Sequence, residues 1–450
     1  MFNAGIDWQK RYREKKGRLL SVGVKLNNDY YFVTELDNIS NSINQNVNSY
    51  FINGNRTLSE IKYAVNADFI EPLDDATYCN WFVDYAVDRQ RYTPGINSDT
   101  TISYSDVAAQ VINYFIKPGY KFQKKGDKFL LNAAVTGILD SRSVAKLNMS
   151  SHTSFLAFDM KIQTDYVINK DANVNLNFER TTSYPGPEQL TNIGNTFDLV
   201  SFATGNLYLL PEVKNTVDFT YKSVLANNGN LYLSGAFDHY TNKFGFVVSS
   251  LLNSPTEIQM VSNVGSANSA RILISYFNNT SNNSTINCSS GINYSQTPSV
   301  INGVLVNNSI ISANGSFSAD IKFPGNFFYI TPTVSTMLNR VFYETGNFDI
   351  VTFTYSDKIT FQCKKVQLAL FPLLNYNHSF GNNTSFSMNG GLKKTVFKGY
   401  GSLWIQGYNI FNSFKFINNY VGPSAYQAVK YSNLQRFILI GLSAKFNNMK

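Results

Sequence analysis

Charged side chains that could bind a solute or hydrate a water-filled space lie at even spacings in three separate stretches of this sequence. They are Asp159, Lys161, Asp218, Lys222, Asp320 and Lys322. Residues an even number apart on a β-strand project from the same face of a sheet. An acid and a base on one face would either keep that face wet or contact a polar ligand, and the spacing alone leaves both interpretations open.

Reactive residue types are too scattered to indicate an enzyme. The sequence contains no GxSxG, no HExxH and no pair of carboxylates in a local context suited to acid–base catalysis. Cys79, Cys288 and Cys363 lie far apart without CxxC spacing, and only three histidines accompany them. We interpret the thiols as small packing residues and expect no metal centre, disulfide framework or cofactor.

Composition indicates a membrane environment without helical spans. Charged residues make up 15% of the 450 positions, against roughly 25% in typical soluble domains, and aromatic residues also reach 15%. A membrane-spanning helix needs roughly 18 or more consecutive apolar residues, and every apolar run in this sequence is interrupted sooner. A transmembrane β-barrel, whose strands are apolar on one face only, remains compatible with the mean hydropathy of −0.18.

The net charge of +8 does not indicate a nucleic-acid partner, because the lysines and arginines are scattered along the chain. Anionic lipid head groups or a polar interior account for this charge equally well. The one dense basic run lies within residues 10–18, and we interpret it as a solvated turn between strands. Residues 1–18 carry too many charges for the apolar core of a signal peptide, so we expect the front of an exported precursor to be missing.

Alternation of apolar and polar residues is the strongest structural signal. Residues 155–163 place Asp159 and Lys161 on one face of a strand and apolar side chains on the other. Residues 174–179 repeat the pattern after a turn, which predicts a hairpin, and similar stretches follow along the chain. The pattern predicts an all-β fold, a large closed antiparallel transmembrane β-barrel of roughly 18–22 strands that occupies residues 1–450.

The connections between the predicted strands fall into two kinds. Short turns with glycine lie at residues 124–127 and 227–230, whereas residues 185–215 and the Asn/Ser-rich residues 278–310 are predicted to be long loops. A barrel in an outer membrane has short periplasmic turns and longer extracellular loops. The long loops would therefore meet arriving ligands.

Several motifs occur in the order typical of a known family. Residues 205–212 read GNLYLLPE, residues 263–265 read NVG, residues 408–412 read YNIFN, and residues 436–446 read RFILIGLSAKF. These motifs resemble the barrel domain of TonB-dependent receptors, specifically the outer-membrane barrel family common in Bacteroidota. The resemblance covers nearly the whole chain.

The resemblance implies a location in the outer membrane of a Gram-negative bacterium and energy-coupled uptake of a bulky nutrient. Such receptors carry a plug domain that is pulled by a TonB-type energy-coupling protein, and we recognise neither a plug nor a signal peptide in residues 1–450. The implied partners are this plug and coupling protein, outer-membrane lipid or lipopolysaccharide, the barrel-assembly machinery and a solute that the sequence does not identify.

A second interpretation is a structural or secretion-associated outer-membrane barrel that anchors partner proteins without transport. An outer-membrane enzyme is not expected, because the sequence has no catalytic cluster. A row of soluble β-sandwich domains is the rival fold, but it would need Pro/Gly-rich linkers about every 100 residues, and none are found.

The last predicted strand divides its residues between two environments. Ile438, Ile440 and Leu442 are predicted to face lipid, while Leu439 on the other face makes the lumen side partly apolar. The resemblance assigns Phe446 as the terminal aromatic residue that the barrel-assembly machinery reads.

Overall fold

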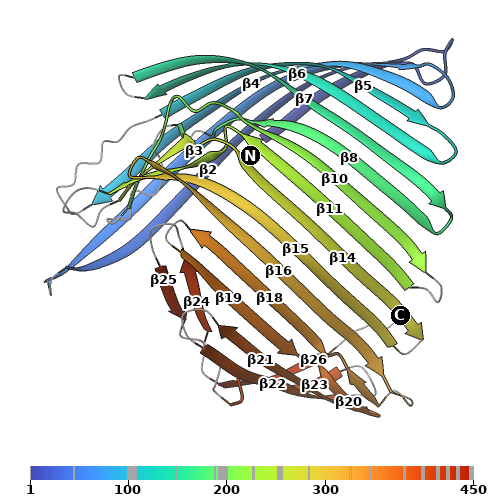
Figure 1. Ribbon diagram of the computed structural model, residues 1–450, viewed down its shortest axis with the longest axis vertical. Coiled ribbons are helices and arrows are strands. Elements are labelled where there is room, and N and C mark those ends of the chain that lie inside the picture. Colours follow the sequence, from blue (N-terminus) through green and yellow to red (C-terminus); the bar gives the residue numbers. More distant parts are fainter. Residues whose placement is uncertain are drawn as a thin grey trace.

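The computed structural model of the chain consists almost entirely of β-strands (Figure 1). It describes residues 2–43, 46–98, 109–146, 149–186, 189–190, 201–225, 229–250, 257–281, 284–323, 325, 327–343, 346–378, 382–396, 401–411, 416–421, 426–431 and 436–444. Within these ranges no helix is long and apolar enough to cross a membrane.

A single sheet of 24 strands contains most of the described residues. Its longer strands pair in chain order as an antiparallel meander that begins at β1 and ends at β26. These strands are β1 (Phe2–Arg11), β2 (Leu19–Ile43), β3 (Asn46–Pro72), β4 (Thr77–Ser98), β5 (Ala109–Lys125), β6 (Phe129–Lys146), β7 (Met149–Asn169), β8 (Ala172–Ser183), β10 (Glu212–Leu225), β11 (Gly229–Thr241), β14 (Ala267–Ser281), β15 (Ser284–Ile301), β16 (Val304–Lys322), β18 (Thr333–Tyr343), β19 (Gly346–Ser356), β21 (Val366–His378), β22 (Asn382–Val396), β23 (Gly401–Tyr408) and β26 (Phe437–Ala444). In Figure 1 the sheet curls from β4–β7 at the top, through β8–β19, to β21, β22, β23 and β26 at the bottom.

Five strands of the sheet are short segments of 3 to 7 residues that belong to the connections. They are β9 (Ser201–Thr204), β12 (Phe244–Ser250), β13 (Glu257–Asn263), β17 (Phe328–Ile330) and β20 (Ile359–Cys363). Without these five, 19 of the 24 strands remain in the meander, which agrees with the 18–22 predicted. A separate hairpin pairs β24 (Phe416–Val421) with β25 (Tyr426–Tyr431). Among the described pairings β1 and β26 have one neighbour each, so barrel closure between them stays a prediction.

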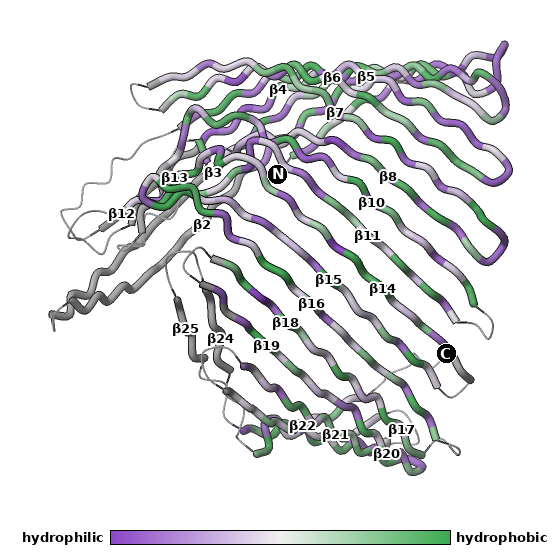
Figure 2. Tube along the Cα trace, viewed as in Figure 1, coloured by the Kyte–Doolittle hydropathy of each residue, from purple (hydrophilic) through white to green (hydrophobic). Residues whose placement is uncertain are grey.

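The two faces of the meander differ in chemistry, as the alternation predicts. The register of β6 against β7 places Leu139 opposite Leu156 on one face and Thr136 opposite Asp159 on the other. Leu156 is 81% exposed, which suits a lipid environment. Figure 2 shows hydrophobic and hydrophilic positions alternating along β8–β16. We call the face that carries Asp159 the inner face and the apolar face the outer face.

The longest connections lie at one rim of the sheet, the loop rim, whereas short turns occur at both rims (Figure 1). At the turn rim, residues 73–76 and 126–128 link neighbouring strands, which confirms the predicted short turn near residues 124–127. At the loop rim, residues 184–211 join β8 to β10 and residues 242–266 join β11 to β14, so the long connection expected at residues 185–215 is present. Of the other predicted short turn at residues 227–230, the first two residues lie outside the described residues, and Gly229 pairs with Leu225 at the start of β11.

The predicted long loop at residues 278–310 is wrong. β15 occupies the middle of this stretch; its first residue, Ser284, pairs with Ser281 of β14, and a tight turn follows its last residue. Asn302 and Gly303 form this turn with φ angles of 51° and 82°, the left-handed region that Asn and Gly tolerate best. Many of the Asn and Ser residues that suggested a loop belong to the inner face, where Ser289 hydrogen-bonds Ser316 across the strands at 2.6 Å. The polar composition of this stretch therefore reflects a strand face in contact with water and does not mark a loop.

The dense basic run forms the turn between β1 and β2, as predicted. Glu71, near the end of β3, accepts hydrogen bonds from Lys15 at 2.5 Å and from two guanidinium nitrogens of Arg18 at 2.6 and 2.9 Å. This contact ties the first turn to the next strand pair along the turn rim.

The last strand has the two faces that its sequence predicts. On the outer face Ile438, Ile440 and Leu442 are 70%, 71% and 63% exposed. On the inner face Phe437 stacks on Tyr408 with 4.6 Å between ring centroids, so aromatic packing from β23 accounts for part of the apolar lumen side. Phe446 lies outside the described residues.

Candidate functional site

Part of the connection between β8 and β10 packs against the inner face of the sheet. We call its described portion, residues 184–186, 189–190 and 205–211, the inner segment. Leu190 and Leu209 pack with Val111 of β5 and Val144 of β6, and all four side chains are only 1–2% exposed. A chain segment at the loop rim is therefore held against the wall of the sheet by apolar burial.

The two halves of the inner segment are joined through Gln189. Its side-chain oxygen accepts a hydrogen bond from the Gly186 N–H at 2.9 Å, and its backbone carbonyl accepts one from the Asn206 N–H at 2.8 Å. Gln189 thus fixes a local turn and connects it to the start of the GNLYLLPE motif.

Two of the sequence motifs meet directly in space. Asn263 of the NVG motif accepts a hydrogen bond from the Leu210 N–H at 2.8 Å and donates one to the Leu210 carbonyl at 3.0 Å. The same amide donates to the Asn242 carbonyl at 2.9 Å. A primary amide can donate and accept at once, which suits it to pairing with both polar groups of one peptide-chain residue.

The end of the GNLYLLPE motif anchors the following connection. Glu212, at the start of β10, is 7% exposed and accepts a hydrogen bond from the Phe244 N–H at 2.8 Å. The Lys243 ammonium lies 3.2 Å from the other carboxylate oxygen. The buried carboxylate is therefore balanced by a cation and a backbone donor, as a buried charge requires.

An ion pair lies buried on the inner face of β6 near the inner segment. Asp140 and Arg142 are 2% and 3% exposed, and their nearest charged atoms are 3.7 Å apart, too far for a hydrogen bond. The Arg142 guanidinium also stands over the Phe155 ring at 5.1 Å. Burial, followed by the carboxylates of Asp140 and Asp159, raises the pKa of the Tyr184 phenol in the inner segment.

The charged residues singled out on β7 and β10 share the inner face. Lys161 lies 3.6 Å from Glu179 of β8, and both side chains remain accessible at 49% and 36%. Asp218 accepts a hydrogen bond from Asn177 at 2.8 Å. The strand registers carry Asp159, Lys161 and Asp218 on one side of the sheet. Their role as solute contacts stays a prediction.

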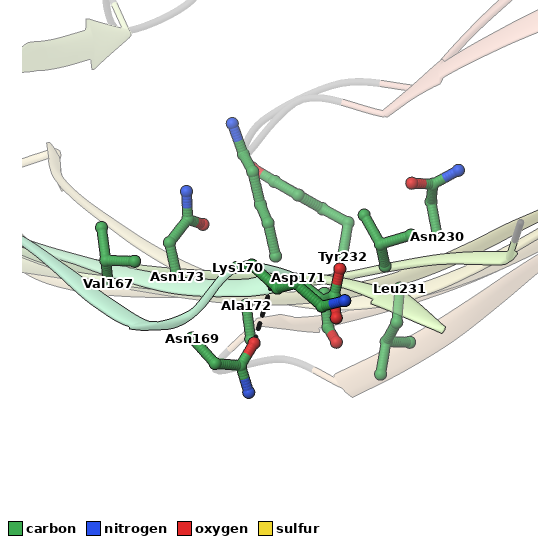
Figure 3. A pocket seen from close by; sticks show the side chains of 12 residues that line it. Val167, Asn169, Lys170, Asp171, Ala172, Asn173, Asn230, Leu231 and Tyr232 are labelled. Atoms are coloured by element: carbon green, nitrogen blue, oxygen red, sulfur yellow. Dashed lines mark hydrogen bonds between the residues drawn. The ribbon is translucent and has the colours of Figure 1, made fainter. Parts of the chain in front are cut away.

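Lys222 lines a pocket of about 560 Å³ at the turn rim (Figure 3). Its ammonium lies 5.9 Å from the centre of the Tyr232 ring. In Figure 3 Asn173 and Asn230 project to the same side of the sheet, while Leu231 projects to the opposite side. An ammonium, a phenol and two amides thus gather on the inner face and could bind an anionic or hydrogen-bonding partner.

The remaining pair of predicted residues lies at the turn-rim end of β16. Asp320 accepts hydrogen bonds from Thr285 at 3.3 Å and Thr331 at 2.7 Å, so its carboxylate is already partnered within the wall. Lys322 is exposed and sits opposite Tyr329 of β17. These residues are separated from Lys222 by β11, β14 and β15, so the six predicted residues do not converge on one site.

Comparison with known proteins identifies the family. The model of the outer membrane protein beta-barrel family matches residues 161–444, well over half of the chain. The chain belongs to this family. It is therefore an outer-membrane β-barrel protein of a Gram-negative bacterium, and the curated proteins compared with it include no match.

Three solved structures align over most of this chain, at low sequence identity and with TM-scores below 0.5. The copper transporter OprC aligns over 98% of this chain and 79% of its own, with 10% identity and a TM-score of 0.44. The siderophore receptor PirA from Pseudomonas aeruginosa aligns over 92% of this chain and 77% of its own, with 7% identity and a TM-score of 0.40. The ferric yersiniabactin uptake receptor FyuA from Yersinia pestis aligns over 98% and 77%, with 9% identity and a TM-score of 0.39.

Sequence reasoning missed several inner-face residues of this family member. Asp140 and Arg142 fall between Ile138 and Val144 in strict period two, so their burial could have been suspected from their apolar neighbours on the same face. Asp238 binds Lys214 at 3.1 Å, Thr216 at 2.7 Å and Ser269 at 3.1 Å. This network joins three strands, and no short sequence pattern indicates it.

Proposed function

We propose that this barrel forms the membrane pathway of an uptake receptor for a bulky nutrient, which is moved inward by an energy-coupled plug. The observation that carries the proposal is the polar inner face, where Lys161, Glu179 and Asp218 lie on adjacent strands with water-accessible charges. A sheet in a bilayer keeps such residues on the side away from lipid. The inner segment lies at the loop rim of this face, where a solute from outside would arrive first.

In this mechanism the solute meets the inner segment and the neighbouring connections before it reaches the charged wall. Amides, ammonium groups and carboxylates of the wall then form hydrogen bonds with the solute, and these bonds replace part of the solute's hydration. The Lys222 pocket at the turn rim supplies a contact for the plug or for a solute that is leaving toward the periplasm. Energy coupling is required because a plugged pathway of this kind does not open by diffusion of the solute alone.

A gene deletion tests this proposal. We expect the deletion strain to lose growth on one member of a panel of iron chelates, cobalamin, oligosaccharides and peptides, each supplied as the limiting nutrient. Growth should return with the wild-type gene and should be abolished again by an uncoupler of the membrane potential. The paired variant Asp218→Asn/Lys222→Gln should reduce uptake of that nutrient, whereas Val217→Ile, on the outer face of the same strand, should not.

The structural alternative makes the opposite forecast. If the barrel anchors surface partners without transport, growth of the deletion strain is unchanged on every nutrient of the panel, and specific surface proteins disappear from the outer-membrane fraction instead. That combination would refute the uptake proposal while leaving the barrel assignment intact.

A further inference from the structure

A groove of about 710 Å³ lies on the outer face of β21, β22, β23 and β26. Its floor contains Gly390 and Gly407, which sit directly opposite each other in the β22–β23 ladder. Because neither residue has a side chain, there is room above them for the side chain of Ile410, which also lines the groove. The walls are aliphatic side chains: Leu368, Leu370, Leu392, Ile405 and Ile438.

The YNIFN motif closes the groove at the loop rim. Asn409 adopts a φ angle of 46°, and its N–H donates to the Asn389 side chain at 2.8 Å. The next residue, Ile410, donates its N–H to the Met388 carbonyl at 2.9 Å. This turn brings the Ile410 side chain over the two glycines, where a Cβ on Gly407 would lie 3.3 Å from it.

Charge and aromatic residues lie at the same end. Arg436 precedes β26, is exposed and borders the groove. Phe411, next to Ile410, lies 5.9 Å from Phe386 of β22. Aromatic side chains of barrels concentrate where the membrane core meets the head groups. The groove therefore runs from the head-group level at the loop rim into the apolar belt.

We propose that this groove binds one acyl chain of a phosphate-bearing lipid in the outward-facing leaflet, with the lipid phosphate against Arg436. Long loops of an outer-membrane barrel face outward, which places the loop rim in that leaflet. The guanidinium fork matches phosphate oxygens in geometry and charge. The aliphatic walls supply dispersion contacts along the acyl chain. These contacts, and not a hydrophobic driving force, favour binding in the groove over a position in the surrounding lipid.

Native mass spectrometry of the detergent-purified barrel, with lipid A added as the probe, tests this inference. We expect the wild type to retain one lipid A per chain. Arg436→Gln removes the guanidinium and should reduce retention by roughly fivefold, the effect of one basic residue near a membrane surface. Gly407→Leu adds a side chain next to Ile410 at the floor of the groove and should also reduce retention, because it takes up space that the acyl chain would occupy. Gly137→Ala is the matched control, because Gly137 lies on the outer face of β6 away from the groove and its Cβ would lie at an ordinary 3.6 Å from Pro118.

Heat-modifiable gel migration of each variant shows whether the barrel has folded. Arg436→Gln leaves the strands unchanged, so the test survives even if Gly407→Leu fails to fold. Equal retention by all folded variants would identify the lipid as non-specific and overturn the proposal. If Arg436→Gln loses lipid A but folded Gly407→Leu retains it, the lipid is held by its head group alone and the acyl-chain site is refuted. If the wild type forms a stable dimer that Gly407→Leu dissociates, the groove binds a second copy of the chain and the proposal is likewise refuted.

Discussion

Asn263 pairs through its side-chain amide with both the N–H and the carbonyl of Leu210, at 2.8 and 3.0 Å. The two residues belong to different connections of the loop rim, so this contact ties the inner segment to the connection between β11 and β14. The variant Asn263→Asp keeps the acceptor for the Leu210 N–H but loses the donors to two carbonyls. Only the bond to the Leu210 carbonyl reaches the inner segment, so we expect this segment to open more often by roughly fivefold, which corresponds to about 1 kcal/mol for one hydrogen bond.

Limited proteolysis followed by mass spectrometry measures this opening, since cleavage within residues 184–211 should accelerate while the strands stay protected. Asn268→Asp is a suitable control, because Asn268 bonds His239 and does not contact Leu210. Unchanged cleavage in Asn263→Asp would show that the apolar cluster around Leu190 suffices to hold the inner segment.

The buried pair Asp140–Arg142 predicts a strong asymmetry between single and double replacements. Asp140→Leu leaves a guanidinium that is 3% exposed without its counter-ion, and Arg142→Met leaves a buried carboxylate without one. Such uncompensated buried charges typically cost about 3–5 kcal/mol. The double variant Asp140→Leu/Arg142→Met removes both charges and should recover most of that loss. Urea unfolding of the barrel in lipid vesicles, arranged as a double-mutant cycle, gives the coupling energy. Additive losses in the cycle would show that the two charges act independently.

The assignment of faces on β7 predicts opposite responses at adjacent residues. Ile162 lies on the outer face, in register with Ala133 and Phe178, and Gln163 lies on the inner face opposite Asn132 and Asn177. Ile162→Lys should destabilise the barrel by about 2–4 kcal/mol, as lysine does on the lipid face near the membrane midplane. Gln163→Lys should change stability little, because its ammonium meets water. Unfolding in vesicles compares the two, and equal losses would contradict the face assignment.

The alternation of β7 and β8 was sufficient to predict their hairpin. A strand with one face toward lipid and the other toward water must alternate apolar and polar residues with period two. The same reasoning failed at residues 278–310, since Asn and Ser are equally suited to turns and to a wet strand face. The contact of Leu190 with Val111 was beyond prediction, because it joins positions far apart in the sequence through a connection without a periodic pattern. The motifs around Leu210 and Asn263 were recognised, but only the fold reveals that they touch.

Phe446 provides a test of barrel assembly that is independent of transport. Family barrels use a terminal aromatic residue as the signal read by the assembly machinery, and Phe446 continues the outer-face series of Ile438, Ile440 and Leu442 in the sequence. We expect Phe446→Ala to reduce the amount of folded barrel in the outer membrane without changing synthesis of the chain. Heat-modifiable protein in membrane fractions measures this amount, with Phe437→Ala as an aromatic control on the inner face. Normal levels in Phe446→Ala would show that the assembly signal lies elsewhere in the chain.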